Sequence, residues 1–258
     1  MLLTADFHTH TQYSHGKGTV LENALVAKER GLKAMGITDH GFAHLAFGLS
    51  KRKIEPLKKD CALATEQTGV KVLVGVEANL VSTNGDVDLN PDRYDHFDIF
   101  LAGIHKLLMF KFGTWFSFGF PNMTLTTFGV KNVPQSLVRR TTNMLIKAIK
   151  KHPIDVITHL NFTSYLDPVE VAKVAADYGT YIELNSKKVH LSDEQLYKVG
   201  QTGARFVIDS DAHSPDRVGE ISLVEETLKR VDFPIDRIDN IDGKYPNFRF
   251  KAFKEKSL

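Results

Sequence analysis

The feature that most constrains the fold is a sevenfold alternation of short apolar runs with longer segments of helical character. The runs that read as strands are residues 2–7, 34–38, 70–76, 98–104, 154–158, 181–184 and 205–208. Helical patterns cover residues 19–30, 50–68, 134–151, 168–178, 192–201 and 222–230. Strands alternating with helices form parallel βαβ units. We therefore expect one α/β domain over residues 1–258, built as a (β/α) barrel, although an open doubly wound sheet has the same pattern.

Two segments interrupt this alternation. Residues 80–89 contain Asn84-Gly85-Asp86, which is a hairpin-turn signal. Residues 107–133 form an insert with six of the 17 phenylalanines and the only tryptophan, Trp115. Long inserts of this kind are usually functional. We expect a lid that selects substrate, an oligomer contact, or an aromatic loop packed on its own barrel. Residues 240–258 are expected to form a C-terminal tail.

Composition excludes several classes of protein. The single cysteine, Cys61, rules out an intramolecular disulfide and a cysteine-based metal site. The formal net charge of +2 shows that the chain as a whole lacks the excess of basic residues that is typical of nucleic-acid-binding proteins. No apolar run approaches the ~18 residues of a membrane span, so no membrane partner is expected. No targeting segment is visible near the N-terminus, and we expect a cytoplasmic protein.

The polar residues at the ends of the predicted strands are rich in metal-ligand types. They are His8, His10 and His15 after the first strand, Asp39 and His40 after the second, Glu77 after the third, His105 after the fourth, His159 after the fifth, and Asp211 and His213 after the seventh. The carboxyl ends of parallel barrel strands meet at one face. A single histidine after a strand is a weak signal, but ligand types follow six of the seven strands, which predicts one shared site.

The donors in this set suit a cluster of metal ions. Seven histidines with Glu77 and Asp211 provide nine nitrogen and oxygen ligands, more than one tetrahedral zinc ion needs. His8 and His10 are two residues apart and point to the same side of an extended segment. Two or three divalent ions bridged by a carboxylate would use all nine ligands. Zinc, manganese and iron all fit these residue types.

Five motifs resemble those of the polymerase and histidinol phosphatase (PHP) superfamily. They are Asp6-Phe7-His8-Thr9-His10 with Ser14-His15-Gly16, then Ile37-Thr38-Asp39-His40-Gly41, Gly75-Val76-Glu77-Ala78-Asn79, Ile157-Thr158-His159, and Ser210-Asp211-Ala212-His213. Together they span residues 5 to about 219. Glu77-Ala78-Asn79, Asn84-Gly85-Asp86 and Ala102-Gly103-Ile104-His105 look most like the stand-alone YcdX-like phosphatase branch.

The resemblance implies a distorted seven-stranded, TIM-like (β/α)7 barrel with a trinuclear metal site at the C-terminal ends of its strands. Its implied ligand groups are His8, His10, Glu77 and Asp211 for one ion, Glu77, His105 and His159 for the second, and His15, His40 and His213 for the third. The implied reaction is hydrolysis of a small-molecule phosphomonoester by a metal-bound hydroxide, with zinc favoured over manganese or iron. Lys106, Lys187 and Arg217 are candidate phosphate contacts. Asp39 and His213 are candidates for proton transfer, beside Glu77 and Asp211 in the catalytic set.

Three other functions remain open from the sequence. A phosphodiesterase or 3′–5′ exonuclease uses the same superfamily fold, but the net charge argues against a nucleic-acid substrate. A non-catalytic metal-binding module keeps the fold without the reaction, but the complete ligand set argues against it. A metal-dependent amidohydrolase also has a His-x-His motif after its first strand, yet Asp211-x-His213 fits the PHP pattern better. The sequence does not decide the substrate, the metal or the oligomeric state.

Overall fold

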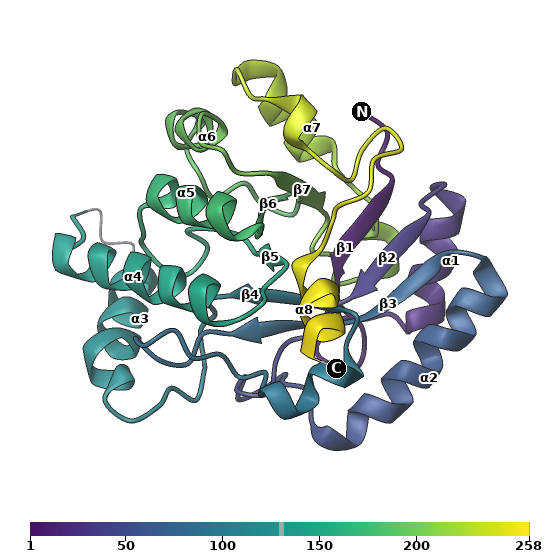
Figure 1. Ribbon diagram of the computed structural model, residues 1–258, viewed down its shortest axis with the longest axis horizontal. Coiled ribbons are helices and arrows are strands. Elements are labelled where there is room, and N and C mark those ends of the chain that lie inside the picture. The colour runs from purple at the N-terminus through teal and green to yellow at the C-terminus, as the bar shows by residue number, and fades with distance from the viewer. Residues whose placement is uncertain (129–131, 258) are drawn as a thin grey trace.

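Seven parallel strands follow one another around a barrel in chain order, with helices outside them (Figure 1). The computed structural model describes residues 1–128 and 132–257. The strands are β1 (Ala5–Thr9), β2 (Ala34–Ile37), β3 (Lys71–Asn79), β4 (Ile99–Gly103), β5 (Val156–Ile157), β6 (Tyr181–Asn185) and β7 (Phe206–Asp209). Each strand pairs in parallel with the next along the chain. The expected seven-stranded (β/α) barrel is confirmed.

The connecting helices lie where the apolar periodicity predicts them. They are α1 (Val20–Glu29), α2 (Lys51–Thr68), α4 (Gln135–Lys151), α5 (Pro168–Tyr178), α6 (Asp193–Gly200) and α7 (Ser222–Arg230). A capping box forms at the start of α6, where Ser192 and Gln195 satisfy each other's backbone N–H groups. Asp167 caps α5 by accepting two backbone N–H bonds, and Gly69 ends α2 in the left-handed conformation.

A side chain completes the seam between the first and last strands. Thr9 of β1 forms a parallel bridge with Ala212, three residues after the end of β7. Below that bridge, the Asn240 amide donates to the carbonyls of Ala5 (2.8 Å) and Ile208 (2.7 Å), and its oxygen accepts from the Ile208 N–H (2.9 Å). Asn240 is fully buried. Its amide therefore takes the place of a missing strand partner and nearly closes the barrel.

The predicted C-terminal tail is an integral part of the barrel. It forms helix α8 (Arg249–Ser257), drawn in yellow in front of the strands in Figure 1; residue 258 lies outside the described residues. Before α8, Phe248 packs edge-on against Phe7 of β1, with ring centroids 4.8 Å apart. The Asp155 carboxylate, just before β5, accepts the Phe250 N–H at 2.8 Å. The segment covers the N-terminal end of the barrel, opposite the predicted site.

The two interrupting segments have defined structure. Residues 80–89 form the expected hairpin, with an antiparallel bridge from Leu80 to Val87 and a left-handed Gly85. A 3-10 helix (Pro91–His96) follows the hairpin. The predicted insert 107–133 contains a π-helix (η2, Trp115–Gly119) and helix α3 (Phe120–Thr127), which the sequence analysis missed. Its residues 129–131 lie outside the described part of the chain.

Two strands continue further than their apolar runs. His8 was predicted to follow the first strand but lies within β1, and Glu77 was predicted to follow the third but lies within β3. Glu77 pairs with Leu101 of β4. The polar side chains of His8 and Glu77 are both fully buried. The apolar pattern predicts the ends of these strands too early, because the side chains that face the barrel interior at this level are polar. The ligand-type side chains contact one another there instead of solvent.

The Asn240 seam makes a prediction about stability. Asn240→Ala leaves three buried backbone groups without partners, and each such loss costs about 1–3 kcal/mol. We expect a loss of about 3 kcal/mol or more in the free energy of unfolding, measured by urea denaturation. The matched control is Asn143→Ala at an exposed position of α4, which should change stability by less than about 0.5 kcal/mol. Equal effects of the two substitutions would contradict the role of Asn240.

Candidate metal centre

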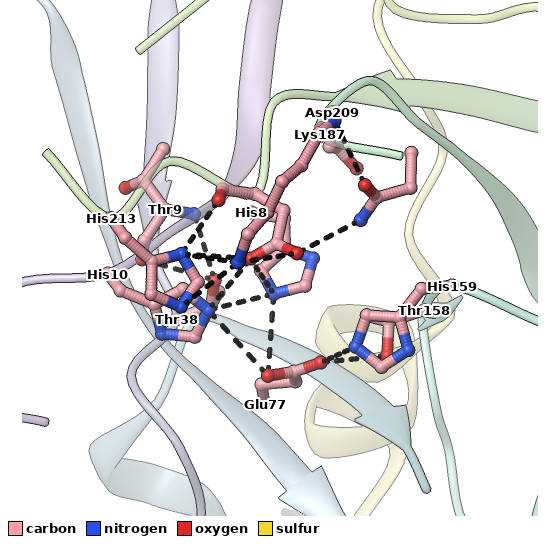
Figure 2. A network of polar contacts seen from close by, with 12 residues as sticks. His8, Thr9, His10, Thr38, Glu77, Thr158, His159, Lys187, Asp209 and His213 are labelled. Carbon is pink, nitrogen blue, oxygen red and sulfur yellow. Dashed lines mark hydrogen bonds and ion pairs between the residues drawn. The ribbon is translucent and has the colours of Figure 1, made fainter. Parts of the chain in front are cut away.

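The centre of the predicted site is the Glu77 carboxylate, which β3 carries into the barrel interior. Figure 2 shows it facing His8, His10 and His159. The carboxylate oxygens lie close to five imidazole nitrogens: His159 Nε2 (2.7 Å), His40 Nδ1 (2.9 Å), His105 Nε2 (3.1 Å), His8 Nε2 (3.4 Å) and His10 Nε2 (3.7 Å). These residues come from four strands or the loops after them. One buried carboxylate thus stands within reach of most of the predicted ligands.

Several imidazole nitrogens of the centre lie within hydrogen-bond distance of one another, and other polar atoms of the centre have no hydrogen-bond partner. His8 Nε2 and His10 Nε2 are 3.1 Å apart, and His105 Nε2 and His159 Nε2 are 3.2 Å apart. Among the described residues, the buried atoms without a hydrogen-bond partner include His10 Nδ1, His15 Nδ1, His40 Nδ1 and Glu77 Oε2. Buried polar atoms are normally satisfied. Converging lone pairs without donors between them are what metal ligands present, so the residues fit a metal centre.

Asp211 and His213 bring the seventh strand into the same centre. Asp211 Oδ1 lies 3.3 Å from His10 Nε2, 3.8 Å from His8 Nε2 and 3.3 Å from His213 Nδ1. Asp211 adopts a positive φ of 48°, which is uncommon for a residue with a side chain. This turn directly after β7 directs the carboxylate into the barrel, where it closes the ring of ligands.

The donor groups overlap instead of separating into the three sets that the resemblance implies. Three donors lie together in each of four groups: His8 with His10 and Asp211, His8 with Glu77 and His159, His40 with Glu77 and His105, and His10 with His40 and His213. His15 adjoins the last group through its ring, which stacks on His40 at 4.8 Å and meets His213 edge-on at 4.2 Å. All nine predicted ligands are therefore brought to one place.

Burial and the Glu77 charge shift the pKa values of the histidines in this centre in opposite directions. Burial, together with the neighbouring His40, holds the pKa of His10 well below its ordinary value, and burial lowers the pKa of His105 to about 4. Burial alone would raise the pKa of Glu77, but His105 and His8 hold it well below the usual range. Burial opposes the charged form of His8 and His159 as well, but Glu77 and Glu183 raise the pKa of both rings above its ordinary value. A divalent ion coordinates neutral imidazole and ionised carboxylate, so its binding would displace protons from these two rings.

Glu183 supports two of these ligands and was missed by the sequence analysis. It lies in β6 and is almost completely buried. Its carboxylate accepts from His8 Nδ1 at 2.5 Å and from the His159 backbone N–H at 2.6 Å. A carboxylate bound to the outer nitrogen of a histidine fixes the ring and leaves the other nitrogen for the metal. The available signal was a lone glutamate in the apolar run 181–184, the same signature as Glu77.

The hairpin after β3 supports His105 through two further residues. Asn79 Oδ1 accepts from His105 Nδ1 at 2.7 Å. Asp88 in turn accepts from the Asn79 side-chain amide at 2.6 Å and from the Ala43 N–H at 2.7 Å, three residues after His40. Asp88 is buried within this contact network, and burial raises its pKa to about 6. The hairpin thereby positions ligands that follow two different strands.

Asp39 has a supporting position. Its carboxylate accepts from the Thr11 N–H (2.8 Å) and hydroxyl (2.6 Å) and from the Ser14 hydroxyl. It lies 4.0 Å from His10 Nδ1. These bonds hold the loop that carries His15. Asp39 therefore supports the ligands from the side away from the cavity. In the described structure it is not one of the residues that line the cavity.

A cavity of about 290 Å³ opens above the ligands. Two predicted phosphate contacts, Lys106 and Lys187, line it, and Lys187 Nζ lies 3.0 Å from His213 and 3.4 Å from Asp211. The third, Arg217, is exposed in a 3-10 helix (Pro215–Arg217) and, within the described part of the chain, is not among the lining residues. His44, which the sequence analysis left outside the set, lines the cavity and stacks on His40.

The chain matches the PHP domain family over residues 6–210. A probable phosphatase from Shewanella loihica is 30% identical over 262 residues, covering 95% of this chain and 92% of the relative. A probable phosphatase from a Thermoanaerobacter species is 29% identical, covering 96% and 95%.

Two solved structures share the fold. The histidinol phosphate phosphatase from Lactococcus lactis, solved with zinc, L-histidinol and phosphate, aligns with a TM-score of 0.60 at 14% identity, covering 91% of this chain and 95% of that chain. A putative histidinol phosphatase from Listeria monocytogenes aligns with a TM-score of 0.56 at 11% identity, covering 84% and 97%. At these identities the two structures establish the architecture alone.

The contact between Glu183 and His8 makes a prediction about metal retention. Glu183→Gln keeps the size of the side chain but removes the charge that orients His8, and losses of this kind typically cost about 10–100-fold in metal affinity. We expect less metal per chain after dialysis against a weak chelator, measured by mass spectrometry, with an unchanged circular dichroism spectrum. Glu66→Gln, at an exposed position of α2, should retain the wild-type metal content. Equal metal content in both variants would remove Glu183 from the support of the centre.

Proposed function

This chain belongs to the PHP domain family, and we propose that it is a metal-dependent phosphatase that hydrolyses a small-molecule phosphomonoester. The observation that carries the proposal is Glu77, a fully buried carboxylate within 3.7 Å of five imidazoles. Such a cluster serves no structural purpose that apolar residues would not serve better. Relatives over almost the whole length are named probable phosphatases, which supports the reaction type.

The proposed centre holds three divalent ions, for which zinc is the first candidate. The ligands are the nine predicted residues: His8, His10, His15, His40, Glu77, His105, His159, Asp211 and His213. Glu77 is the proposed bridge because its two oxygens face different histidines, Oε1 toward His105 and His159, and Oε2 toward the others. Imidazole and carboxylate donors suit zinc, with manganese and iron as alternatives. The zinc in the Lactococcus lactis structure supports this choice.

The side chains around the cavity have separate tasks in the proposed reaction. Bound divalent ions supply Lewis-acid polarisation of the phosphoryl group and activation of water at neutral pH. Lys187 and Lys106 attract the phosphate dianion to the mouth, where Lys187 Nζ already stands beside Asp211. Glu183, Asn79 and Asp39 hold the surrounding loops and rings in place. Asp39 is therefore proposed as a positioning residue rather than the proton-transfer group first considered.

The size and walls of the cavity favour a small ester. Ligand sites in proteins usually have volumes of about 300–1,000 Å³, so about 290 Å³ suits a small molecule. Phe47 and Phe162 stand on its rim beside Leu107. His15 stacks on the Phe47 ring at 4.7 Å, and His159 lies 4.9 Å from the Phe162 ring. These rings offer an apolar surface to the leaving group while the lysines contact the phosphate.

Metal removal tests the proposal. We expect purified protein to contain about three equivalents of transition metal and to hydrolyse an aryl phosphate. Exhaustive chelation should abolish the hydrolysis, and added zinc or manganese should restore it. Glu77→Gln should lose metal and activity together while remaining folded, because the bridge needs an ionised carboxylate. Metal analysis and a chromogenic phosphatase assay provide the measurements.

The matched control is Glu29→Gln on the exposed side of α1, which should keep both metal and activity. Full activity in metal-free protein would overturn the metal-dependent mechanism. Full activity in Glu77→Gln would exclude Glu77 from it. Faster hydrolysis of single-stranded oligonucleotides than of any small monoester would favour the phosphodiesterase alternative. Bound metal without any hydrolysis would favour the non-catalytic module.

Lys187 gives a prediction about substrate binding. Lys187→Met keeps the length of the side chain and removes its charge, so a phosphate at the cavity mouth loses a charge-assisted contact. We expect kcat/KM to fall about 10–100-fold, mainly through KM, in steady-state kinetics. Lys188→Met is the matched control, since the neighbouring lysine is also exposed but does not line this cavity in the described structure. Similar kinetics in both variants would contradict the phosphate contact.

A further inference from the structure

One long stretch of this chain contains no acidic residue. Between Asp98 and Asp155 lie eight of the 33 lysines and arginines and none of the 31 aspartates and glutamates. The rest of the chain holds 25 basic residues against 31 acidic ones. The small net charge of the protein thus conceals a segment of strong positive charge. Charge separated in this way attracts an anionic partner to one part of the surface.

The same stretch exposes large aromatic side chains. Of the rings in residues 112–128, here called the aromatic segment, Phe112 is 99% exposed, Phe128 80% and Phe116 70%. Phe120 and Trp115 are also exposed, whereas Phe118 is buried in the core. The hypothesis of an aromatic loop packed on its own barrel therefore holds for Phe118 but fails for most of the rings. Single exposed apolar residues are ordinary, but a cluster of them marks an interaction site.

Cations stand directly beside these rings. Lys111 precedes Phe112 and is itself exposed. Arg140 of α4 donates to the Ser117 carbonyl, between Phe116 and Phe120 in the chain. Figure 1 shows α3 and α4 as neighbours on the left of the molecule, and η2 contacts both helices. The positive charge and the exposed rings therefore occupy the same region.

We propose that the aromatic segment and its neighbouring cations dock this protein on the surface of an anionic lipid bilayer. Phenylalanine and tryptophan side chains insert at the boundary between headgroups and acyl chains, while lysine and arginine pair with anionic headgroups. Both kinds of contact are present here in one segment. Among the described residues no helix has the length and apolar character needed to cross a membrane, so the contact is peripheral. This inference revises the expectation of no membrane partner.

Two other occupants fit the segment less well. Asp86 pairs with Lys111 and Lys151, but one carboxylate does not balance the basic residues of this stretch. A symmetric dimer would place the same segment of both copies together, and the excess positive charge would repel across the two-fold axis. A nucleic acid accepts cations and aromatic rings, but Leu107 and Met109, which are exposed just before the aromatic segment, offer no ring on which a base can stack. A bilayer accommodates the aliphatic and the aromatic side chains together.

The docking surface adjoins the mouth of the metal centre. Leu107 is 55% exposed and also lines the cavity, two residues after the ligand His105. Lys106 lines the same mouth. The aromatic segment thus begins five residues after the cavity lining in the chain. Binding of the segment to a bilayer is measurable without any assay of catalysis.

Vesicle flotation tests the proposal directly. The probes are vesicles of phosphatidylcholine alone and vesicles with about 30% phosphatidylserine. We expect the intact protein to float with the anionic vesicles at low salt, and to do so at least about tenfold less with neutral vesicles or in about 0.5 M salt. The triple variant F112S/F116S/F128S should bind at least about tenfold more weakly. Its matched control is Leu223→Ser with Tyr197→Ser, which removes exposed apolar side chains from α7 and α6.

A charge-neutralising pair separates the electrostatic contribution. Arg139→Gln with Lys150→Gln, both exposed on α4, should weaken flotation several-fold. Lys28→Gln with Lys33→Gln, exposed near α1, should not. No flotation of the wild type, or equal flotation of the aromatic variant and its control, would overturn the proposal. So would an aromatic variant that changes only the oligomeric state in light scattering, or a wild type that binds single-stranded DNA but no vesicle.

Discussion

The burial of the Glu77 carboxylate is the constraint on which the site depends. An isolated ionised carboxylate in a dry interior is strongly destabilising unless it is paired. Here the barrel surrounds the charge with imidazoles on β1 and in the loops after β2, β4 and β5. Burial alone would lower the pKa of His8 and of His159, but Glu77 and Glu183 raise both, whereas burial lowers the pKa of His105 to about 4. The imidazoles therefore compensate the charge only in part. Divalent cations at the same place would complete the compensation, which is why the stability of this interior and its chemistry are coupled.

A set of buried hydrogen bonds keeps these ligands from rearranging. Glu183 holds the His8 ring and the backbone of His159, Asn79 holds His105, and Asp88 holds Asn79. His159 and Asp211 both have positive φ, a conformation that costs of order 1 kcal/mol or more for residues with side chains. The His159 N–H bond to Glu183 is one of the contacts that stabilise this backbone. The strain is located where the chain leaves a strand and must direct a ligand into the barrel.

The sequence predicts which donor residues converge on the site, but not the residues that support them, for a physical reason. Histidines and carboxylates at the ends of apolar runs stand out against a pattern that otherwise requires apolar residues, so all nine donors were identifiable. Glu183 gave the same signal, but a single glutamate does not reveal that it faces His8 across the barrel. Asn79 and Asp88 act through contacts nine residues apart that only the folded hairpin creates. Asn240 and the tail were unpredictable because their partners on the first strand, Ala5 and Phe7, are more than 200 residues away in the chain.

The two ends of the barrel therefore carry different kinds of interaction. At the N-terminal end the tail buries Phe248 against Phe7 and Phe250 in the core, and stability there comes from apolar area. At the C-terminal end polar side chains replace the apolar ones. Buried charge is less favourable for stability, but the chemistry of the site requires it. Asn240 lies between the apolar and the polar end of the barrel, because it joins β1 to β7 along the seam beneath His8, His10 and Asp211. Two buried carboxylates add to this seam nearer the site: Asp209 accepts the Phe7 N–H at 2.7 Å, and Asp6 accepts the Ser210 hydroxyl at 2.5 Å. The first and the last groups of candidate ligands are therefore held together by the polar contacts that close the barrel.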